Sequence, residues 1–224
     1  MELEIRMKMN ERLYLRDPES SDLGKRIVRE GILLIHKIGF EDFTFKKLAT
    51  VINTTESGIY RYFENKHRLL VYIIALYWNL VEYLVVFNTQ NITDPEKKLK
   101  LVINVLADEI DESIAGNQIN NKALFQIVIS ESNKVYLTKH VSTDNKEQLF
   151  KPYKDLCSRI AGFLLEYNPT YPFARSLSST LIESAHLQYF FMNNLPSLTD
   201  FGKEKDTEKI KKFLEHLVFS TLKK

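Results

Sequence analysis

The stretch 43-FTFKKLATVINTTESGIYRYFENKHRLL-70 contains two short segments with helical apolar spacing, separated by a sharp turn. The first segment, residues 45–52, follows Thr44, whose hydroxyl can cap a helix. Asn53 then occupies the turn, and asparagine is one of the few residues besides glycine that tolerate a left-handed backbone. Thr55 can cap a second short helix two residues later. This spacing of helix, tight turn and helix predicts a helix-turn-helix unit.

The second segment has two faces. Ile59 and Phe63 are predicted to point into a small core, while the polar and aromatic residues around them face solvent. A slim, polar helix tip lets base edges of DNA approach closely, and Arg61 can donate two hydrogen bonds to guanine. Tyrosine hydroxyls on the same face suit phosphate oxygens. The candidate DNA contacts are Thr44, Lys46, Thr55, Glu56, Ser57, Gly58, Tyr60, Arg61, Tyr62 and Lys66.

Charge favours a local rather than a global nucleic-acid surface. The whole chain has a net charge of only +2, whereas residues 44–68 carry five basic and two acidic side chains. Lys66 begins the next helix, where its charge is predicted to join the exposed amides in binding a phosphate. Glu56 has two interpretations: it accepts from the amino group of cytosine, or it is a solvent-facing bystander.

This stretch resembles the helix-turn-helix of the TetR family of transcriptional regulators. The positions of the family pattern are held by Leu48, Ala49, Asn53, Thr55, Tyr60, Tyr62, Phe63 and Lys66. The resemblance covers roughly residues 24–70 and departs at the turn, where asparagine replaces the usual glycine. It implies a homodimer, joined through the last two long helices, that places two recognition helices on a palindromic operator. It also implies a repressor, in preference to an activator, that a small-molecule effector releases.

Composition favours an all-helical protein. The 224 residues are 44% hydrophobic but include only 7 glycines and 6 prolines, fewer turn formers than average. Helices are predicted at 23–39, from 65 onward, and at 94–115, 120–137, 146–167 with a kink at Pro152, 171–195 and 206–222. The predicted fold is therefore all-α, with an N-terminal three-helix head and a larger C-terminal helical domain, which the family resemblance implies to serve effector binding and dimerisation.

The predicted domains are an extended arm at 1–17, a helix-turn-helix DNA-binding domain at 18–65, and an effector-binding and dimerisation domain at 66–224. Within the arm, residues 2–9 alternate polar and apolar side chains with the period of a strand. Three interpretations of this arm stay open. It is a frayed tail, an arm packed on the body or on a partner chain, or an arm that touches DNA.

Aromatic residues of the middle helices are the candidate effector contacts, because the family resemblance implies a small molecule bound between those helices. These candidates are Tyr77, Trp78, Phe125, Tyr153, Phe163, His186, Tyr189 and Phe190. An aromatic stripe at helical spacing belongs to a packed core more often than to a cavity. Core packing therefore stays open as the alternative for each of them.

Several other functions are disfavoured by the sequence. Within the predicted C-terminal domain at 66–224, Glu183 and His186 are the only pair with the spacing of one half of a di-metal site, so neither a metal nor a cofactor is predicted. The chain lacks the common catalytic motifs, so we do not expect an enzyme. Its single Cys157 fits a reducing cytoplasm. The most apolar stretch, residues 69–87, is interrupted by two polar residues, so no membrane span is predicted.

Two alternatives to a DNA-binding regulator remain. One is a helical small-molecule-binding or protein-interaction module whose DNA head is non-functional, and the other is a helical-bundle enzyme. Salt-dependent DNA binding separates a regulator from the first alternative, since neutralising phosphates releases counterions. Catalytic turnover would separate it from the second.

Overall fold

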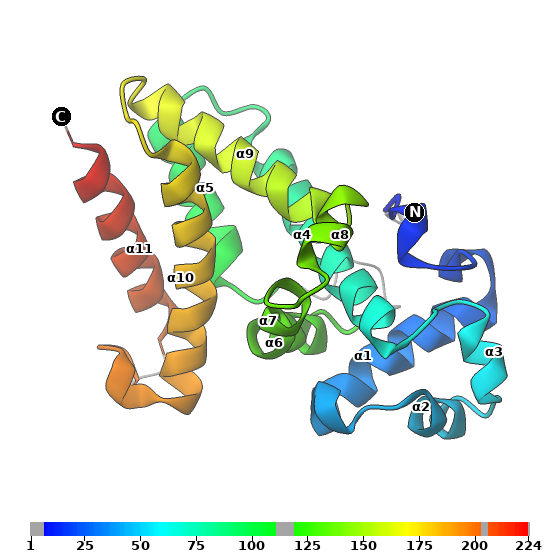
Figure 1. Cartoon of the computed structure of the whole chain (residues 1–224). Helices are drawn as coiled ribbons and strands as arrows, with labels where there is room; N and C mark the ends of the chain where they lie inside the picture. Colours follow the sequence, from blue (N-terminus) through cyan, green and yellow to red (C-terminus); the bar gives the residue numbers. More distant parts are fainter. Residues whose placement is uncertain (1–6, 111–118, 203–205, 224) are drawn as a thin grey trace. The chain divides into compact units, whose positions relative to one another are not determined.

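The computed structural model describes residues 7–110, 119–202 and 206–223. Within these ranges the chain forms helices joined by turns and contains no strand, so the predicted all-α class is confirmed. The chain divides into two compact units, residues 1–80 with 110–151 and residues 81–109 with 152–224. Figure 1 labels the helices of both units along the chain.

The first unit contains the helix-turn-helix and the helices that pack on it. Its elements are η1 Glu11–Leu13, η2 Pro18–Ser20, α1 Asp22–Asp42, α2 Phe45–Val51, α3 Glu56–Tyr60, the first part of α4 Lys66–Thr89, α6 Asn121–Glu131, α7 Asn133–Tyr136 and α8 Val141–Lys146. Helix α1 packs against η2, α2 and α6, and α2 packs against α3. The predicted three-helix head is therefore present as α1, α2 and α3 (Figure 1).

Side-chain caps start the three helices of the head. The hydroxyl of Ser21 accepts a hydrogen bond from the amide of Gly24, and Thr44 accepts one from Lys47. Thr55 in the same way accepts from Gly58 at 3.2 Å. Each cap satisfies an amide that has no partner within the first helical turn. The caps predicted at Thr44 and Thr55 are confirmed.

Two left-handed residues set the turns between these helices. Asn53 has φ 50° between α2 and α3, as predicted, and Gly39 has φ 75° near the end of α1. Gly39 interrupts the regular helix, after which α1 continues for a short final turn to Asp42. Glycine suits this position because it has no Cβ to clash in the left-handed region. The chain therefore bends at Gly39 before it enters α2.

Helix α4 is the most apolar element of the chain. By length and composition alone it could cross a membrane, but 72% of its most apolar window is buried inside the protein. Tyr72, Tyr77 and Trp78 are each at most 2% exposed. The polar Asn79 donates to the Ala75 carbonyl at 3.0 Å, so its amide is satisfied within the helix. These features are those of a core helix.

The second unit is a helical bundle. Its elements are the end of α4, α5 Pro95–Ala107, nearly all of α9 Lys151–Tyr167, α10 Ala174–Asn194, η3 Pro196–Leu198 and α11 Thr207–Leu222. Helices α10 and α11 pack against each other, and both pack against α5. Ile210, Leu214 and Val218 of α11 are fully buried. Part of the apolar face of α11 is thus buried by contacts within one chain.

Three predicted helices differ from those observed. The helix predicted at 120–137 is divided at Ser132 into α6 and α7. Helix α5 ends at Ala107 because Asp108 takes extended dihedrals, whereas the prediction reached residue 115, and residues 111–118 lie outside the described ones. The helix predicted at 146–167 is observed only from Lys151 onward, as α9, because residues 147–150 form a turn with Gln148 at φ 61°, and Lys146 is the last residue of the preceding α8. Pro152 therefore lies in the first turn of α9, where its missing amide costs no hydrogen bond, and it makes no kink.

The predicted arm and domain boundaries stay predictions. Residues 1–6, which hold most of the alternating pattern, lie outside the described residues. From Met9, which is 7% exposed, the chain packs on the first unit and continues into η1. The described part of the arm beyond Met9 is thus in contact with the body.

The turn at Asn53 gives a first prediction. Asn53→Ala should lower the free energy of unfolding by about 1 kcal/mol, because alanine pays the steric penalty of a left-handed backbone. Asn53→Gly is the matched control and should be at least as stable as Asn53→Ala, since glycine pays no such penalty. Urea denaturation followed by circular dichroism measures both variants. Equal stability of the alanine and glycine variants would contradict the strained turn.

Candidate nucleic-acid interface

The outer surface of the helix-turn-helix is formed by the caps and first turns of α2 and α3. Besides capping α3, the Thr55 hydroxyl lies 2.9 Å from the hydroxyl of Ser57. These short side chains keep the start of α3 slim and polar, which suits close approach to base edges. The predicted contacts that are exposed are Thr44, Lys46, Thr55, Glu56, Ser57, Tyr60 and Arg61.

The inner face of α3 is anchored in the core of the head. Ile59 and Phe63 are both 0% exposed, so their predicted inward orientation is confirmed. Gly58 lies between the two faces, and a Cβ there would come within 3.0 Å of the Thr54 hydroxyl. Tyr60 packs its ring edge-on against Phe45 at 5.0 Å while remaining 47% exposed. Helix α3 is thus fixed by the packing of its inner face on the core of the head, and its polar face points outward.

Tyr62 does not lie on the exposed face. It is 2% exposed, and its hydroxyl is 2.7 Å from the hydroxyl of Ser21 at the start of α1. The prediction that this hydroxyl faces a phosphate is therefore wrong for this structure. The chain has already left α3 at this point, and the side chain turns back toward the head. The tyrosine pair separates into one exposed ring, Tyr60, and one buried ring.

The ammonium group of Lys66 is also turned inward. It donates to the carbonyls of Phe40 at 3.0 Å and of Glu41 and Phe43 at 3.1 Å each. It lies 4.7 Å from the centre of the Phe40 ring as well, a cation–π distance. The predicted role of this charge at a DNA phosphate is therefore corrected. The charge holds the carbonyls at the end of α1, which have no partner within the helix.

Residues of α6 and α7 also bind the bend between α1 and α2. A carboxylate oxygen of Glu131, which is 8% exposed, accepts from the Phe40 amide at 3.1 Å. Lys134 pairs with Glu131 at 2.9 Å and with Glu41 at 2.7 Å. The bond to Lys134 lowers the pKa of Glu41, and the bond to Glu41 raises the pKa of Lys134. Two elements from outside the head therefore fix the path of the chain into α2.

Three of the predicted effector contacts form an aromatic cluster in the first unit. The ring of Tyr77 lies 5.0 Å from Trp78 and 6.3 Å from Phe125. The indole of Trp78 donates to the Tyr136 hydroxyl at 2.7 Å. Burial raises the pKa of Tyr77 well above its ordinary value, so its hydroxyl stays protonated at physiological pH.

The other five predicted effector contacts belong to the second unit. Tyr153 donates to a carboxylate oxygen of Glu183, and Tyr189 donates to Glu109, both at 2.8 Å. Their partners are therefore acidic groups of the same unit. The remaining three are Phe163 and His186, which are buried, and Phe190, which is half-buried. The effector assignment stays a prediction for all eight residues.

His186 is buried as a neutral imidazole. It is 6% exposed, and burial lowers its pKa to about 4. Glu183, three residues earlier, is bonded to Tyr153. No group of three or more histidine, cysteine or acidic side chains that could hold a metal ion occurs among the described residues. The pair thus consists of a core histidine and a carboxylate that accepts a tyrosine hydrogen bond.

Comparison with known proteins identifies the head. Residues 27–73 match the family model of bacterial regulatory proteins of the tetR family. The N-terminal head is thus similar to the DNA-binding domain of this family. No curated protein matches the sequence significantly. The matched residues run from α1 through the helix-turn-helix into the first part of α4, and so include the exposed tip of α3.

Solved structures share the fold over most of the chain. AibR, solved with isovaleryl coenzyme A and operator DNA, superposes with a TM-score of 0.62 at 14% identity, over 87% of this chain and 98% of that one. The fatty acid degradation regulator FadR from Bacillus halodurans gives 0.58 at 18% identity, over 86% and 92%. A TerR/AcrR-family regulator from Aquifex aeolicus VF5 gives 0.52 at 17% identity, over 86% and 95%. At these identities the likeness concerns the fold.

The sequence-based interpretation of the TetR-type head missed two residues that fix the ends of its helices, Ser21 and Glu131. Ser21 carried a usable signal, because its position before α1 is typical of a cap, but nothing local indicated that it meets Tyr62. Glu131 carried a weaker one: an acidic residue at a position that the helical period makes inward-facing. A buried acid requires hydrogen-bond or charged partners, and besides the local Lys134 one of them here is distant, the Phe40 amide.

The inward position of Lys66 in the TetR-type head gives a second prediction. Lys66→Met should lower the free energy of unfolding by about 2 kcal/mol, because three carbonyls lose a charged donor. The control Lys46→Met removes an exposed lysine of α2 and should change stability by no more than about 0.5 kcal/mol. Chemical denaturation of both variants measures the difference. Equal losses would contradict the assignment of Lys66 to the end of α1.

The buried His186 gives a third prediction, for pH dependence. Its pKa is about 4 when folded and about 6.5 when unfolded, so the unfolded chain binds the proton first as the pH falls. Its contribution to stability is therefore complete above pH 6.5 and declines by about 3 kcal/mol toward pH 4. The free energy of unfolding, measured by denaturation at several pH values in this range, should decline less steeply with falling pH for His186→Gln than for wild type. His216→Gln, on an exposed face of α11, should keep the wild-type slope.

Proposed function

We propose that the protein is a one-component transcriptional regulator that binds a palindromic DNA operator as a homodimer. A repressor fits this proposal better than an activator, since an effector then acts by weakening DNA binding. The observation that carries the proposal is the tip of α3. Thr55, Glu56, Ser57 and Arg61 are exposed there, while Ile59 is fully buried within the segment that matches the tetR family model.

The roles of the exposed residues follow from their chemistry. Arg61 suits guanine because its guanidinium can donate two hydrogen bonds to the major-groove edge. The hydroxyls of Thr44, Thr55 and Tyr60, with Lys46, suit phosphate oxygens on either side of the groove. Glu56 keeps both interpretations, a reader of cytosine or a bystander. Gly58 and Ser57 allow the DNA to come close.

The last two helices supply the proposed dimer contact. The packing of α10 on α11 buries Ile210, Leu214 and Val218 inside one chain. Other apolar side chains of these helices remain outward, with Leu187 44% exposed and Phe213 36% exposed. A second copy could cover them by forming a four-helix bundle around a two-fold axis. Such symmetry matches a palindromic operator.

The proposed effector is a small molecule, and a short-chain acyl coenzyme A is the first compound class to test. The support is the structure of AibR with isovaleryl coenzyme A, since AibR shares the fold over 87% of this chain. The proposed contacts are the eight predicted residues on α4, α6, α9 and α10. We place the protein in the cytoplasm, where both the DNA and the coenzyme A ester would be accessible.

The fourth prediction tests DNA recognition. The protein should select a palindromic duplex from a random pool, and its affinity should fall as the salt concentration rises, because the exposed Lys46 and Arg61 of each head bring positive charge to the phosphates. Arg61→Ala should cost about 1–3 kcal/mol and relax the preference at one base position in each half-site. Fluorescence anisotropy on the selected duplex and its single-base variants measures both effects.

The control is Lys97→Ala, which removes an exposed positive charge from α5 in the second unit. It should leave the base preference unchanged. If the wild-type protein enriches no duplex and its weak binding shows no base preference, the regulator proposal fails. The module with a non-functional DNA head then becomes the better interpretation.

A further inference from the structure

Tyr62 ends the helix-turn-helix in contact with the N-terminal segment, defined here as residues 7–21. Its hydroxyl is 2.7 Å from the Ser21 hydroxyl, and its carbonyl accepts the Leu15 amide at 2.8 Å. The guanidinium of Arg16 lies 5.4 Å from the centre of its ring. The end of α3 is therefore held by hydrogen bonds that come from outside the helix-turn-helix itself.

The N-terminal segment contacts α4 through Met9 and Tyr14. Leu13 is 1% exposed, and the sulfur of Met9 accepts the Asn79 amide group at 3.4 Å. Tyr14 contacts Tyr72 edge-on, with ring centres 6.3 Å apart. Burial of these side chains gives the segment a fixed path. It is therefore a part of the first unit that can resist displacement of α3.

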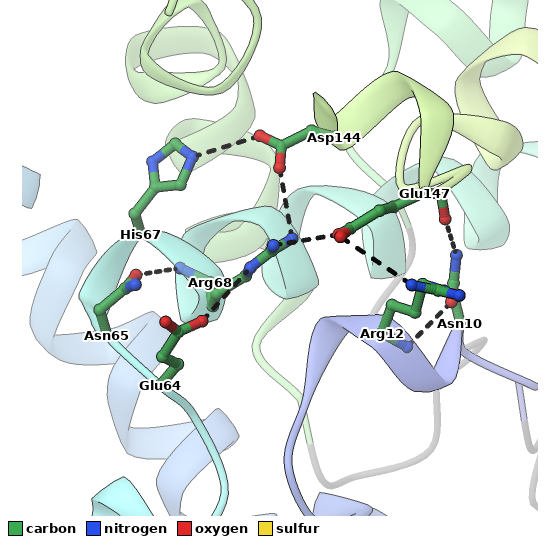
Figure 2. Close-up of polar contacts among 8 residues, drawn as sticks. All are labelled: Asn10, Arg12, Glu64, Asn65, His67, Arg68, Asp144 and Glu147. Atoms are coloured by element: carbon green, nitrogen blue, oxygen red, sulfur yellow. Dashed lines mark hydrogen bonds and ion pairs between the residues drawn. The ribbon is translucent and has the colours of Figure 1, made fainter. Parts of the chain in front are cut away.

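The other end of the segment is tied to the end of α8. The side-chain amide of Asn10 donates to the Glu147 carbonyl at 2.9 Å, and the guanidinium of Arg12 lies 4.0 Å from the Glu147 carboxylate. The same carboxylate lies 3.0 Å from the guanidinium of Arg68 of α4, and the Asp144 carboxylate lies 3.4 Å from it. Figure 2 shows Arg68 between these two carboxylates. The segment thus connects Glu147 to Tyr62.

Helix α3 needs such external support because it is short. It contains only five residues, Glu56–Tyr60, and a helix of this length has little stability of its own. Its start is fixed by the Thr55 cap and its inner side by Ile59. Its end is fixed where Tyr62 meets the N-terminal segment. A loose end would let the exposed face tilt, and base contacts require a fixed direction.

We propose that the N-terminal segment positions α3 for base recognition, with Tyr62 as the point of contact and Glu147 as the anchor. This inference rests on the proposed DNA-binding function and adds positioning residues that do not touch DNA. Asn10, Leu15 and Ser21 act through Tyr62 on the direction of α3. The base-reading residues remain those at the tip of α3.

Two variants of the full chain test this positioning. The double variant Asn10→Ala/Arg12→Ala removes the side chains that reach Glu147, and Tyr62→Phe removes only the hydroxyl that meets Ser21. Each should weaken binding to the selected duplex by about five- to tenfold, the cost of one or two lost hydrogen bonds. Binding to a scrambled duplex of equal length should change by less than about twofold, since phosphate contacts are untouched.

Three further measurements separate positioning from other roles. Lys8→Ala, the control, removes one exposed positive charge from the same segment, as the double variant does, and should bind both duplexes as wild type does. The salt dependence of the double variant should equal that of wild type, because no phosphate contact is lost. Thermal unfolding should show that each variant is folded at the assay temperature.

The outcomes distinguish this inference from the function on which it rests. If wild type selects no duplex, the proposed function fails. If wild type selects a duplex and both variants bind that duplex with wild-type affinity, the positioning role is overturned. Equal weakening on both duplexes with a shallower salt dependence would mean that the segment contacts phosphate. A lower unfolding temperature with an unchanged ratio of affinities would mean that it only adds stability, and either result overturns the inference.

Discussion

The ammonium group of Lys66 fixes the bend between α1 and α2, and the arrangement of the head depends on this bend. Its three bonds go to the carbonyls of Phe40, Glu41 and Phe43, at the bend where the chain leaves α1 and approaches α2. Carbonyls at a helix end lack intrahelical partners, and a buried one without a donor is costly. A single lysine at the start of α4 satisfies three of them. The direction in which α2 and α3 leave α1 is therefore fixed by a residue that follows both of them in the sequence.

Glu131 completes this arrangement from the side of α6. It accepts the Phe40 amide, so the same bend is bound by a cation on its carbonyls and by an anion on its amide. Lys134 then balances the buried carboxylate and reaches Glu41. A displacement of α6 cannot leave these bonds intact without moving the bend. The contacts give the path by which a change outside the head would reach α2, provided that α6 moves relative to α1.

Features of the head that depend on neighbours in the sequence could be predicted, and those that depend on distant partners could not. The caps at Thr44 and Thr55 and the left-handed Asn53 follow from rules that act over three or four residues. Tyr62 and Lys66 were assigned to DNA because their residue types suit phosphate. Their actual partners lie 41 residues away at Ser21 and at least 23 residues away at the end of α1. Only the fold brings those groups together.

The inward side chains narrow the surface that can meet DNA. Of the five basic residues between 44 and 68, Lys47 donates to the Asp42 carbonyl, Lys66 to the end of α1, and Arg68 pairs with Glu147. Lys46 and Arg61 are exposed. Three of the five basic side chains therefore bind carbonyls or carboxylates of the protein itself. Phosphate contacts from each head must then depend more on hydroxyls and backbone amides, which carry no counterion to release and contribute little to salt dependence.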